Sequence, residues 1–210
     1  MASNASPEPG LRYAAPALPP GAPLVKIVIG GGYGVGKTTF VRNVSETAGM
    51  FTEADMTRAA EGVDDLVATP RKKTTTVSMD FGRITLNEDQ DPVVLYLFGL
   101  PGQQRFAFLW KDLLEGAVGA VVLVDTGRVA DCFPALQLLE HRRLPYVVAI
   151  NRFPGAPLYP RSEIRDALQL SERVPIVDID ARRRDQGADA LKALIHHLLD
   201  LPQDDDGHAA

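Results

Sequence analysis

The sequence is poor in three features that would have placed it in a specialised class of proteins. It has one cysteine, Cys132, in 210 residues, so it can form neither an intramolecular disulfide nor a cysteine-based zinc cluster. Its longest apolar runs, Val93–Phe98 and Ala117–Val124, fall far short of the roughly 20 residues that a membrane-spanning helix needs. The 22 basic and 27 acidic side chains give a net charge of −5 without a basic stripe, which argues against nucleic acid as the main partner.

Proline is unevenly distributed along the chain. Six of the 16 prolines precede residue 24, and residues 1–23 have few large apolar side chains and no apolar periodicity. Such a segment buries too little apolar area to offset its ordering entropy, so we expect a disordered Pro/Ala-rich arm there. Residues 202–210 contain three consecutive aspartates and are expected to form a disordered acidic tail. One folded domain over residues 24–201 remains.

The two ends of the sequence also carry no lipidation signal. The last residues form no prenylation motif, and Met1-Ala2 offers no glycine for myristoylation. We therefore expect a cytoplasmic protein with no direct membrane anchor, which would associate with a membrane only through a partner.

Strand-like and helix-like segments alternate through the predicted domain. Continuous apolar strands such as Ala120–Val124 need cover on both faces, which is typical of a parallel sheet between helices. Residues 76–86 and 92–98 are separated by a short polar turn and predict an antiparallel hairpin. We expect a three-layer α/β P-loop NTPase fold, with a six-stranded, mostly parallel sheet and one antiparallel edge strand. The strands are expected at 24–30, 76–86, 92–98, 119–124, 146–150 and 174–179, and the helices at 37–48, 103–114, 129–142, 161–170 and 188–199.

The strongest motif lies between the first strand and the first helix, where residues 31–38 fit G-x-x-x-x-G-K-[ST]. Glycines let successive backbone N–H groups surround phosphate oxygens, and the helix N-terminus adds a favourable dipole. Lys37 is expected to reach the β- and γ-phosphates, and the Thr38 hydroxyl to ligate Mg²⁺. The residues expected to hold the phosphates are Gly31, Gly32, Tyr33, Gly34, Val35, Gly36, Lys37, Thr38 and Thr39.

A second motif, Gly99-Leu100-Pro101-Gly102-Gln103, ends the second strand of the hairpin. It resembles the second switch of Ras-like GTPases, which reads D-x-x-G-Q. The resemblance implies that the Gly102 N–H binds the γ-phosphate and that Gln103 orients the attacking water. Gly99 stands where the family has an aspartate in the metal's shell, so another acid has to replace it or magnesium binding is weakened.

Residues 74–81 resemble the first switch of the same family, where T-x-x-x-D-F is common. This resemblance implies that Thr76 ligates Mg²⁺ and senses the γ-phosphate, with Thr75 as the alternative in the neighbouring register. The spacing from Thr38 is about twice that of small GTPases, which indicates an insertion over Phe51–Lys73. The insertion is either a solvated loop or the source of an arginine that acts in cis.

Two further segments resemble the base-binding loops of Ras-like proteins. Asn151-Arg152-Phe153-Pro154 follows a strand as N-K-x-D does, but Pro154 replaces the aspartate that reads guanine. Asp180-Ala181-Arg182 resembles the S-A-K loop, and Asp180 either supplies the missing acid or forms an ordinary turn. The residues expected to contact the nucleotide outside the P-loop are Gly102, Asn151, Arg152, Phe153, Asp180, Ala181 and Arg182.

Taken together, these motifs resemble most closely the conservon-type GTP-binding proteins of actinobacteria, relatives of the bacterial polarity GTPases. The resemblance implies GTP or GDP as ligand, Mg²⁺ as cofactor, and a roadblock-type regulatory protein and a sensor histidine-kinase-like protein as partners. Tyr33 stands where Ras-like proteins have glycine, and its bulk beside Gln103 predicts slow hydrolysis of GTP. We therefore expect a slow, partner-regulated GTP/GDP switch. The alternatives are a nucleotide-binding scaffold without useful hydrolysis and a P-loop ATPase or kinase in which Asp125 is the Walker-B acid.

Overall fold

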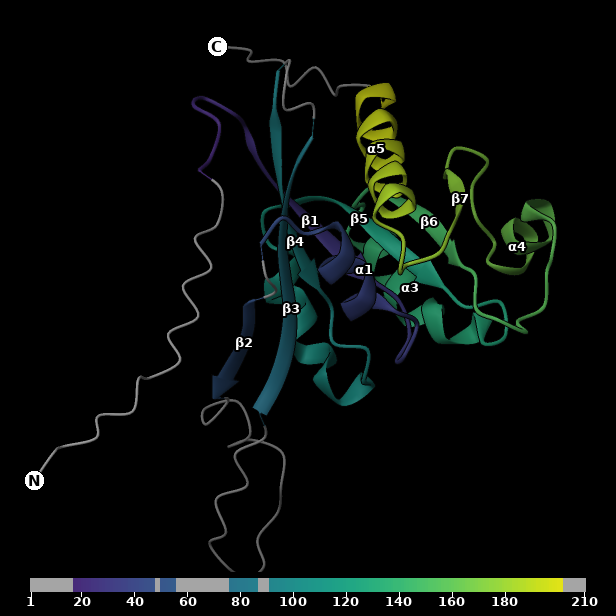
Figure 1. Cartoon of the computed structure of the whole chain (residues 1–210). Coiled ribbons are helices and arrows are strands. Elements are labelled where there is room, and N and C mark those ends of the chain that lie inside the picture. Colours follow the sequence, from purple (N-terminus) through teal and green to yellow (C-terminus); the bar gives the residue numbers. More distant parts are fainter. Residues whose placement is uncertain (1–16, 48–49, 56–75, 87–90, 202–210) are drawn as a thin grey trace, which may run out of the picture.

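The computed structural model describes residues 17–47, 50–55, 76–86 and 91–201. These residues form one sheet in the order β2-β3-β4-β1-β5-β6-β7, with helices on both faces (Figure 1). The strands are β1 (Leu24–Gly30), β2 (Met50–Asp55), β3 (Thr76–Leu86), β4 (Val93–Gly99), β5 (Ala117–Val124), β6 (Tyr146–Asn151) and β7 (Ile176–Ile179). The helices are α1 (Lys37–Val44), α2 (Trp110–Leu114), α3 (Phe133–His141), α4 (Arg161–Ala167) and α5 (Arg184–Asp200), with the short 3₁₀ helices η1 (Gln104–Leu109) and η2 (Val129–Cys132).

The sheet separates two apolar cores. Alternating strand residues such as Ile27 and Leu123 pack with α1 and α5 on one face, where Phe40 and Leu191 are fully buried. Residues of opposite parity, such as Val122, pack with α2, α3 and α4 on the other face. Strands that are apolar on both faces are the reason why the sheet lies between helix layers. The expected three-layer α/β fold is therefore confirmed.

The sheet nevertheless differs from the expected one at its edge. Among the described residues it has seven strands, because Met50–Asp55 forms β2, which pairs antiparallel with β3. The strand that runs opposite to the others, β3, is thus one place inside the edge and pairs antiparallel with β4, with Phe81 opposite Phe98. The expectation of six strands with an antiparallel edge strand was wrong in this respect, because β2 begins the segment that we had interpreted as an insertion. Figure 1 shows β2 and β3 at one side of the molecule and β7 and α4 at the other.

Helix α1 is shorter than its sequence pattern predicts, and the reason lies at Ser45. The expected helix over 37–48 ends at Val44, because the backbone of Ser45 is extended (ψ 141°). The Ser45 hydroxyl instead donates to the Thr47 carbonyl (2.8 Å) and accepts from the backbone N–H of Arg83 on β3 (3.1 Å). A side chain that bonds nearby backbone groups competes with helix continuation. The chain therefore leaves the helix and turns toward β3.

The two predicted tails are only partly within the described residues. Residues 1–16 and 202–210 lie outside them, as does the part of the insertion after β2, residues 56–73. Within 17–23 the Ala22 N–H donates to the Pro19 carbonyl, and the Pro23 carbonyl accepts from the N–H of Val94 on β4. The chain thus joins the sheet one residue before β1 begins.

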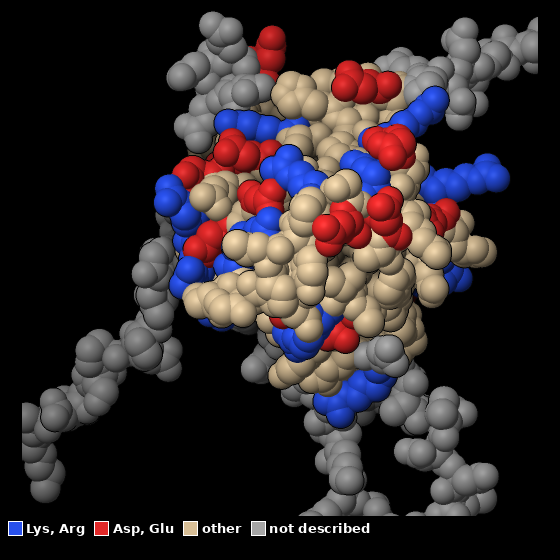
Figure 2. Space-filling model, turned by 90° about the vertical axis from the view of Figure 1, so that its right-hand side faces the viewer, with Lys and Arg blue, Asp and Glu red and all other residues tan. Residues whose placement is uncertain are grey.

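The charges on the side of the molecule around α4 and β7 are mixed. Figure 2 shows acidic and basic side chains next to one another on this side, and ion pairs such as Arg161–Asp178 (2.7 Å) join them. Within the part of the chain that the structure describes, no helix has both the length and the apolar character required to cross a membrane.

Candidate functional site

The predicted phosphate loop connects the central strand β1 to the N-terminus of α1. Gly36, the residue before the helix, has φ 101°, and a Cβ there would lie 2.7 Å from Nδ2 of Asn151. Both the left-handed backbone and the close approach require glycine. The loop therefore has the conformation in which backbone N–H groups line a phosphate site at a helix N-terminus.

Lys37 is buried at the first position of α1 and is held by the loop itself. Its Nζ donates to the carbonyl of Gly31 (2.9 Å) and to that of Gly32 (2.6 Å). Burial lowers the pKa of this ammonium group to about 8, and the nearby Asp80 carboxylate partly opposes that shift. The Lys37 side chain is thus already positioned before a nucleotide binds, and phosphate oxygens would stabilise its positive charge.

A cavity of about 520 Å³ lies next to this lysine. Its walls are the phosphate loop, Thr38 and Thr39, Asp80 of β3, and the segment from Gly99 to Gln103 with Arg105 and Phe106. The loop and the predicted second switch therefore face one space, as the sequence predicted.

The second switch lies directly on the phosphate loop. A Cβ at Gly102 would come within 2.7 Å of the Lys37 Nζ and 2.9 Å of the Tyr33 Cα, so only glycine fits at that position. Gln103 precedes η1 and lines the same cavity. The indole N–H of the buried Trp110 donates to the Pro101 carbonyl (3.0 Å) and anchors the switch from the opposite side.

An acidic residue that sequence reasoning passed over completes the cavity. The Thr38 hydroxyl donates to Oδ2 of Asp80 at 2.7 Å. A Cβ at Gly99 would lie 3.0 Å from the Asp80 Cβ, so Asp80 fills the space beside Gly99. A hydroxyl and a carboxylate are hard oxygen donors of the kind that Mg²⁺ prefers, so these residues fit a magnesium ion. The signal was present in the sequence as the acid of T-x-x-x-D-F opposite Gly99.

The side chain of the predicted first-switch threonine, Thr76, lies outside what the structure describes. Thr76 begins β3, four residues before Asp80, and in an extended strand this separates their Cα atoms by about 13 Å. The prediction that its side chain ligates Mg²⁺ lies outside what the structure describes, as does Thr75.

The predicted base-binding residues form a second, smaller cavity of about 130 Å³. It shares Gly36 and Thr39 with the phosphate cavity, so one nucleotide can extend through both. Asn151 joins its two loops, because its Nδ2 donates to the Val35 carbonyl and its Oδ1 accepts from the Ala181 N–H, both at 2.9 Å. The other residues that line this cavity are Arg152, Phe153, Pro154, Asp180 and Arg182.

The charged groups of this second cavity are already paired. Asp180 accepts from the Arg182 guanidinium at 2.8 and 2.7 Å and from the Arg182 N–H at 3.0 Å. These hydrogen bonds lower the pKa of Asp180 to about 2, so its carboxylate stays ionised at neutral pH. Arg152 forms an ion pair with Asp178 of β7. Asp180 therefore has both properties considered for it: it lines the base cavity and it holds a turn.

Asp125, the alternative Walker-B acid, is engaged elsewhere. One carboxylate oxygen accepts from the Gly127 N–H (2.8 Å) and the other from the Arg128 guanidinium (3.1 Å). Arg128 in turn lies against the phosphate loop, 3.5 Å from where a Cβ of Gly34 would be. The acid that contacts Thr38 is thus Asp80, and Asp125 supports the loop through Arg128.

The buried lysine predicts a pH dependence. Phosphate oxygens favour the charged form of Lys37, so its pKa should rise above about 8 when a nucleotide binds. Affinity should then be highest below pH 8 and fall by up to about tenfold per pH unit above it, because binding requires proton uptake. Titration with a fluorescent nucleotide across this range measures the effect. The Lys37→Arg variant stays charged and should show no fall; a flat profile in the natural protein would contradict the prediction.

A central strand followed by a glycine-rich phosphate loop, with its buried lysine at the N-terminus of the next helix, defines the class of P-loop nucleotide-binding proteins. Within that class the chain belongs to the family described as conserved hypothetical ATP binding protein, which matches residues 28–201.

Two relatives are similar to this chain over more than half of its length. An uncharacterized protein of Methanocaldococcus jannaschii is 28% identical over 130 residues, which are 61% of this chain and 70% of the relative. An elongation factor G-like protein of Synechocystis is 27% identical over 156 residues, 73% of this chain but only 23% of that protein. The prediction of a P-loop nucleotide-binding protein is confirmed.

Proposed function

We propose that the protein binds a purine nucleoside triphosphate with Mg²⁺ and hydrolyses it slowly, as a switch whose state is set by the γ-phosphate. The observation that carries the proposal is the position of Gly102 and Gln103 against the phosphate loop. The Gly102 Cβ position lies 2.7 Å from the Lys37 Nζ, so a γ-phosphate bound by Lys37 would contact the second switch directly. Binding and loss of that phosphate would therefore move this segment.

The hydrolysis step uses residues that line the phosphate cavity. Water attacks the γ-phosphorus, the bond to the β-phosphate oxygen breaks, and the water's protons pass to the phosphate product and solvent. Gln103 would orient the water, while Lys37 and the loop N–H groups would stabilise the charge on the phosphate oxygens. Thr38 would help to hold Mg²⁺, which would neutralise part of the negative charge on the phosphates.

Tyr33 supports a slow rate. It lines the phosphate cavity beside Gln103, and 65% of its surface is exposed. Its bulk at the mouth of the cavity would restrict the positions open to Gln103 and to an arginine from a partner. A partner that moves Tyr33 or the second switch would accelerate turnover.

Two bases are candidates, and different observations favour each of them. Adenine is favoured by the description of the family, by Pro154 in place of a base-reading acid, and by the pairing of Asp180 with Arg182. Guanine is favoured by the Asp180 carboxylate in the base cavity, since guanine offers two N–H donors that adenine lacks. We place ATP first, with the guanine switch as the second candidate.

Single-turnover hydrolysis tests the proposal. The purified protein is loaded with ATP or GTP, and phosphate release is followed together with competition of the two nucleotides for binding. The Gln103→Leu variant should bind as tightly as the natural protein and hydrolyse at least about tenfold more slowly, because the water is no longer held. Tyr33→Gly should hydrolyse faster. Binding of nucleotide with no phosphate release in any of the three proteins would instead support a scaffold without useful hydrolysis. Equal, measurable turnover in all three would contradict the roles of Gln103 and Tyr33.

A further inference from the structure

Gly99 stands where the Ras-like magnesium site has an aspartate. The structure contains another carboxylate, that of Asp80, beside Thr38. Among the described residues that line the phosphate cavity, Asp80 is the one acidic side chain. It accepts the hydroxyl proton of Thr38 at 2.7 Å and lies close enough to Lys37 to favour its charged form. Asp125, the other acid considered, is occupied by Arg128 and the Gly127 N–H.

Side chains at positions 80 and 99 would crowd each other, because these residues lie side by side on neighbouring strands. Phe81 pairs with Phe98 across the antiparallel strands β3 and β4, which places Asp80 beside Gly99. A Cβ at residue 99 would lie 3.0 Å from the Asp80 Cβ and 3.2 Å from its Oδ2. A side chain at position 99 would therefore compete with Asp80 for the same space. A carboxylate at position 99 would thus crowd the one at position 80.

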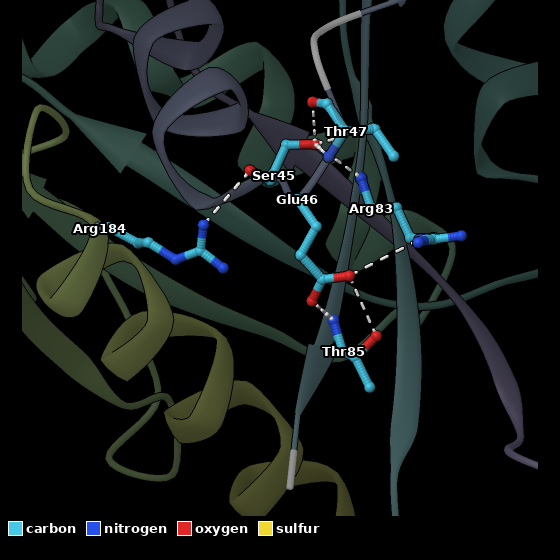
Figure 3. Close-up of polar contacts among 6 residues, drawn as sticks. All are labelled: Ser45, Glu46, Thr47, Arg83, Thr85 and Arg184. Carbon is cyan, nitrogen blue, oxygen red and sulfur yellow. Dashed lines mark hydrogen bonds and ion pairs between the residues drawn. The ribbon is translucent and has the colours of Figure 1, made fainter. Parts of the chain in front are cut away.

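Contacts further along β3 hold the strand, and with it Asp80, against α1 and the residues that follow α1. Two residues further along β3, a Cβ at Gly82 would lie 2.8 Å from Val41 of α1, so the strand rests directly on the helix. Beyond Gly82, the Glu46 carboxylate accepts from the N–H and the hydroxyl of Thr85, and it lies 3.7 Å from the Arg83 guanidinium. Figure 3 shows Glu46 directed at Thr85 and Arg83. These contacts fix β3 against the helix that carries Thr38.

We propose that Asp80 supplies, from the antiparallel strand β3, the carboxylate of the magnesium site that position 99 lacks. Its Oδ2 accepts a hydrogen bond from the Thr38 hydroxyl, which leaves the lone pairs of that hydroxyl oxygen free for the metal. Oδ1 is then available to accept a hydrogen bond from a metal-bound water. Partners of this kind orient a metal ligand, and their loss typically costs about 10- to 100-fold in metal affinity. The proposal rests on the proposed binding of a magnesium nucleotide.

The test measures how strongly Mg²⁺ supports nucleotide binding, not turnover. A fluorescent nucleotide triphosphate is titrated with the full-length protein in EDTA and at increasing Mg²⁺, and bound Mn²⁺ is counted separately by electron paramagnetic resonance. Asp80→Asn keeps the size of the side chain and should leave affinity in EDTA within about twofold of the natural protein. It should raise the Mg²⁺ concentration for half-maximal effect by about 10- to 100-fold.

Two further variants make the outcome decisive. The exchange Asp80→Gly with Gly99→Asp moves the carboxylate to the other strand and should restore at least part of the Mg²⁺ response; it also serves if Asp80→Asn folds poorly. Asp189→Asn, at an exposed acid of α5 outside the site, should keep the natural Mg²⁺ midpoint. A natural midpoint in Asp80→Asn, no recovery in the exchange variant, or a shifted midpoint in Asp189→Asn would each overturn the role of Asp80. Failure of the natural protein to bind any nucleotide would instead overturn the proposed function itself.

Discussion

Replacing Lys37 with alanine is expected to lower the affinity for a nucleoside triphosphate by about a hundredfold. Charged hydrogen bonds of this kind contribute about 1.5–3 kcal/mol each, and one lysine serves two phosphates. In this fold the ammonium group is buried and already held by the carbonyls of Gly31 and Gly32, so little ordering is needed when the nucleotide arrives. A fluorescent-nucleotide titration of both proteins, in Mg²⁺, measures the loss.

The control for this experiment is a lysine outside the site. Lys192 of α5 is 56% exposed and faces Asp189 at 3.9 Å. Lys192→Ala should bind nucleotide as the natural protein does. An affinity for Lys37→Ala within a few-fold of the control would show that the loop does not bind phosphate through this residue.

Replacing Glu46 with alanine is expected to destabilise the fold by about 3 kcal/mol, because it removes the acidic partner of the buried ion pair with Arg83. Only 11% of the Glu46 side chain and 8% of the Arg83 side chain is exposed. The same carboxylate accepts from the Thr85 N–H and hydroxyl, and these donors lose their acceptor as well. Denaturant unfolding monitored by far-ultraviolet circular dichroism measures the change in the free energy of unfolding.

An exposed ion pair provides the comparison. Asp189→Ala removes the acid of the Asp189–Lys192 pair on the surface of α5 and should change stability by less than about 1 kcal/mol. Equal effects of Glu46→Ala and Asp189→Ala would mean that the contacts between the end of α1 and β3 contribute little. Figure 3 also shows Arg184 of α5 reaching the Ser45 carbonyl, at 3.5 Å. Because that contact does not involve Glu46, it should survive the substitution.

Local sequence patterns correctly predicted the segments that have both a recognisable motif and a regular spacing of apolar residues. The phosphate loop, the β3–β4 hairpin and the order of strands and helices after β4 follow from glycine spacing and apolar runs, and Gly102 and Gln103 lie where the motif placed them. Strand β2 was missed because its sequence, MFTEAD, has no sustained alternation and merges into a polar segment.

The pairing of distant residues could not be predicted in the same way. The importance of Asp80 depends on the register that puts it beside Gly99, and a register is set by the whole sheet. Similarly, the sequence indicated that Asn151 belongs to the site, but its bonds to Val35 and Ala181 depend on how β6 and β7 align with the loop. These contacts are tertiary, and no local propensity encodes them.

The central place of β1 has a consequence for how the chain acquires its activity during synthesis. β1 is made first, but its neighbours are β4 and β5, and the loop that follows it is tied by Asn151 to a strand made still later. Contacts this distant along the chain form late and slow the folding of a domain. The phosphate loop would therefore gain its shape only after β6 has left the ribosome. A chain could then bind nucleotide only once most of the domain has been synthesised.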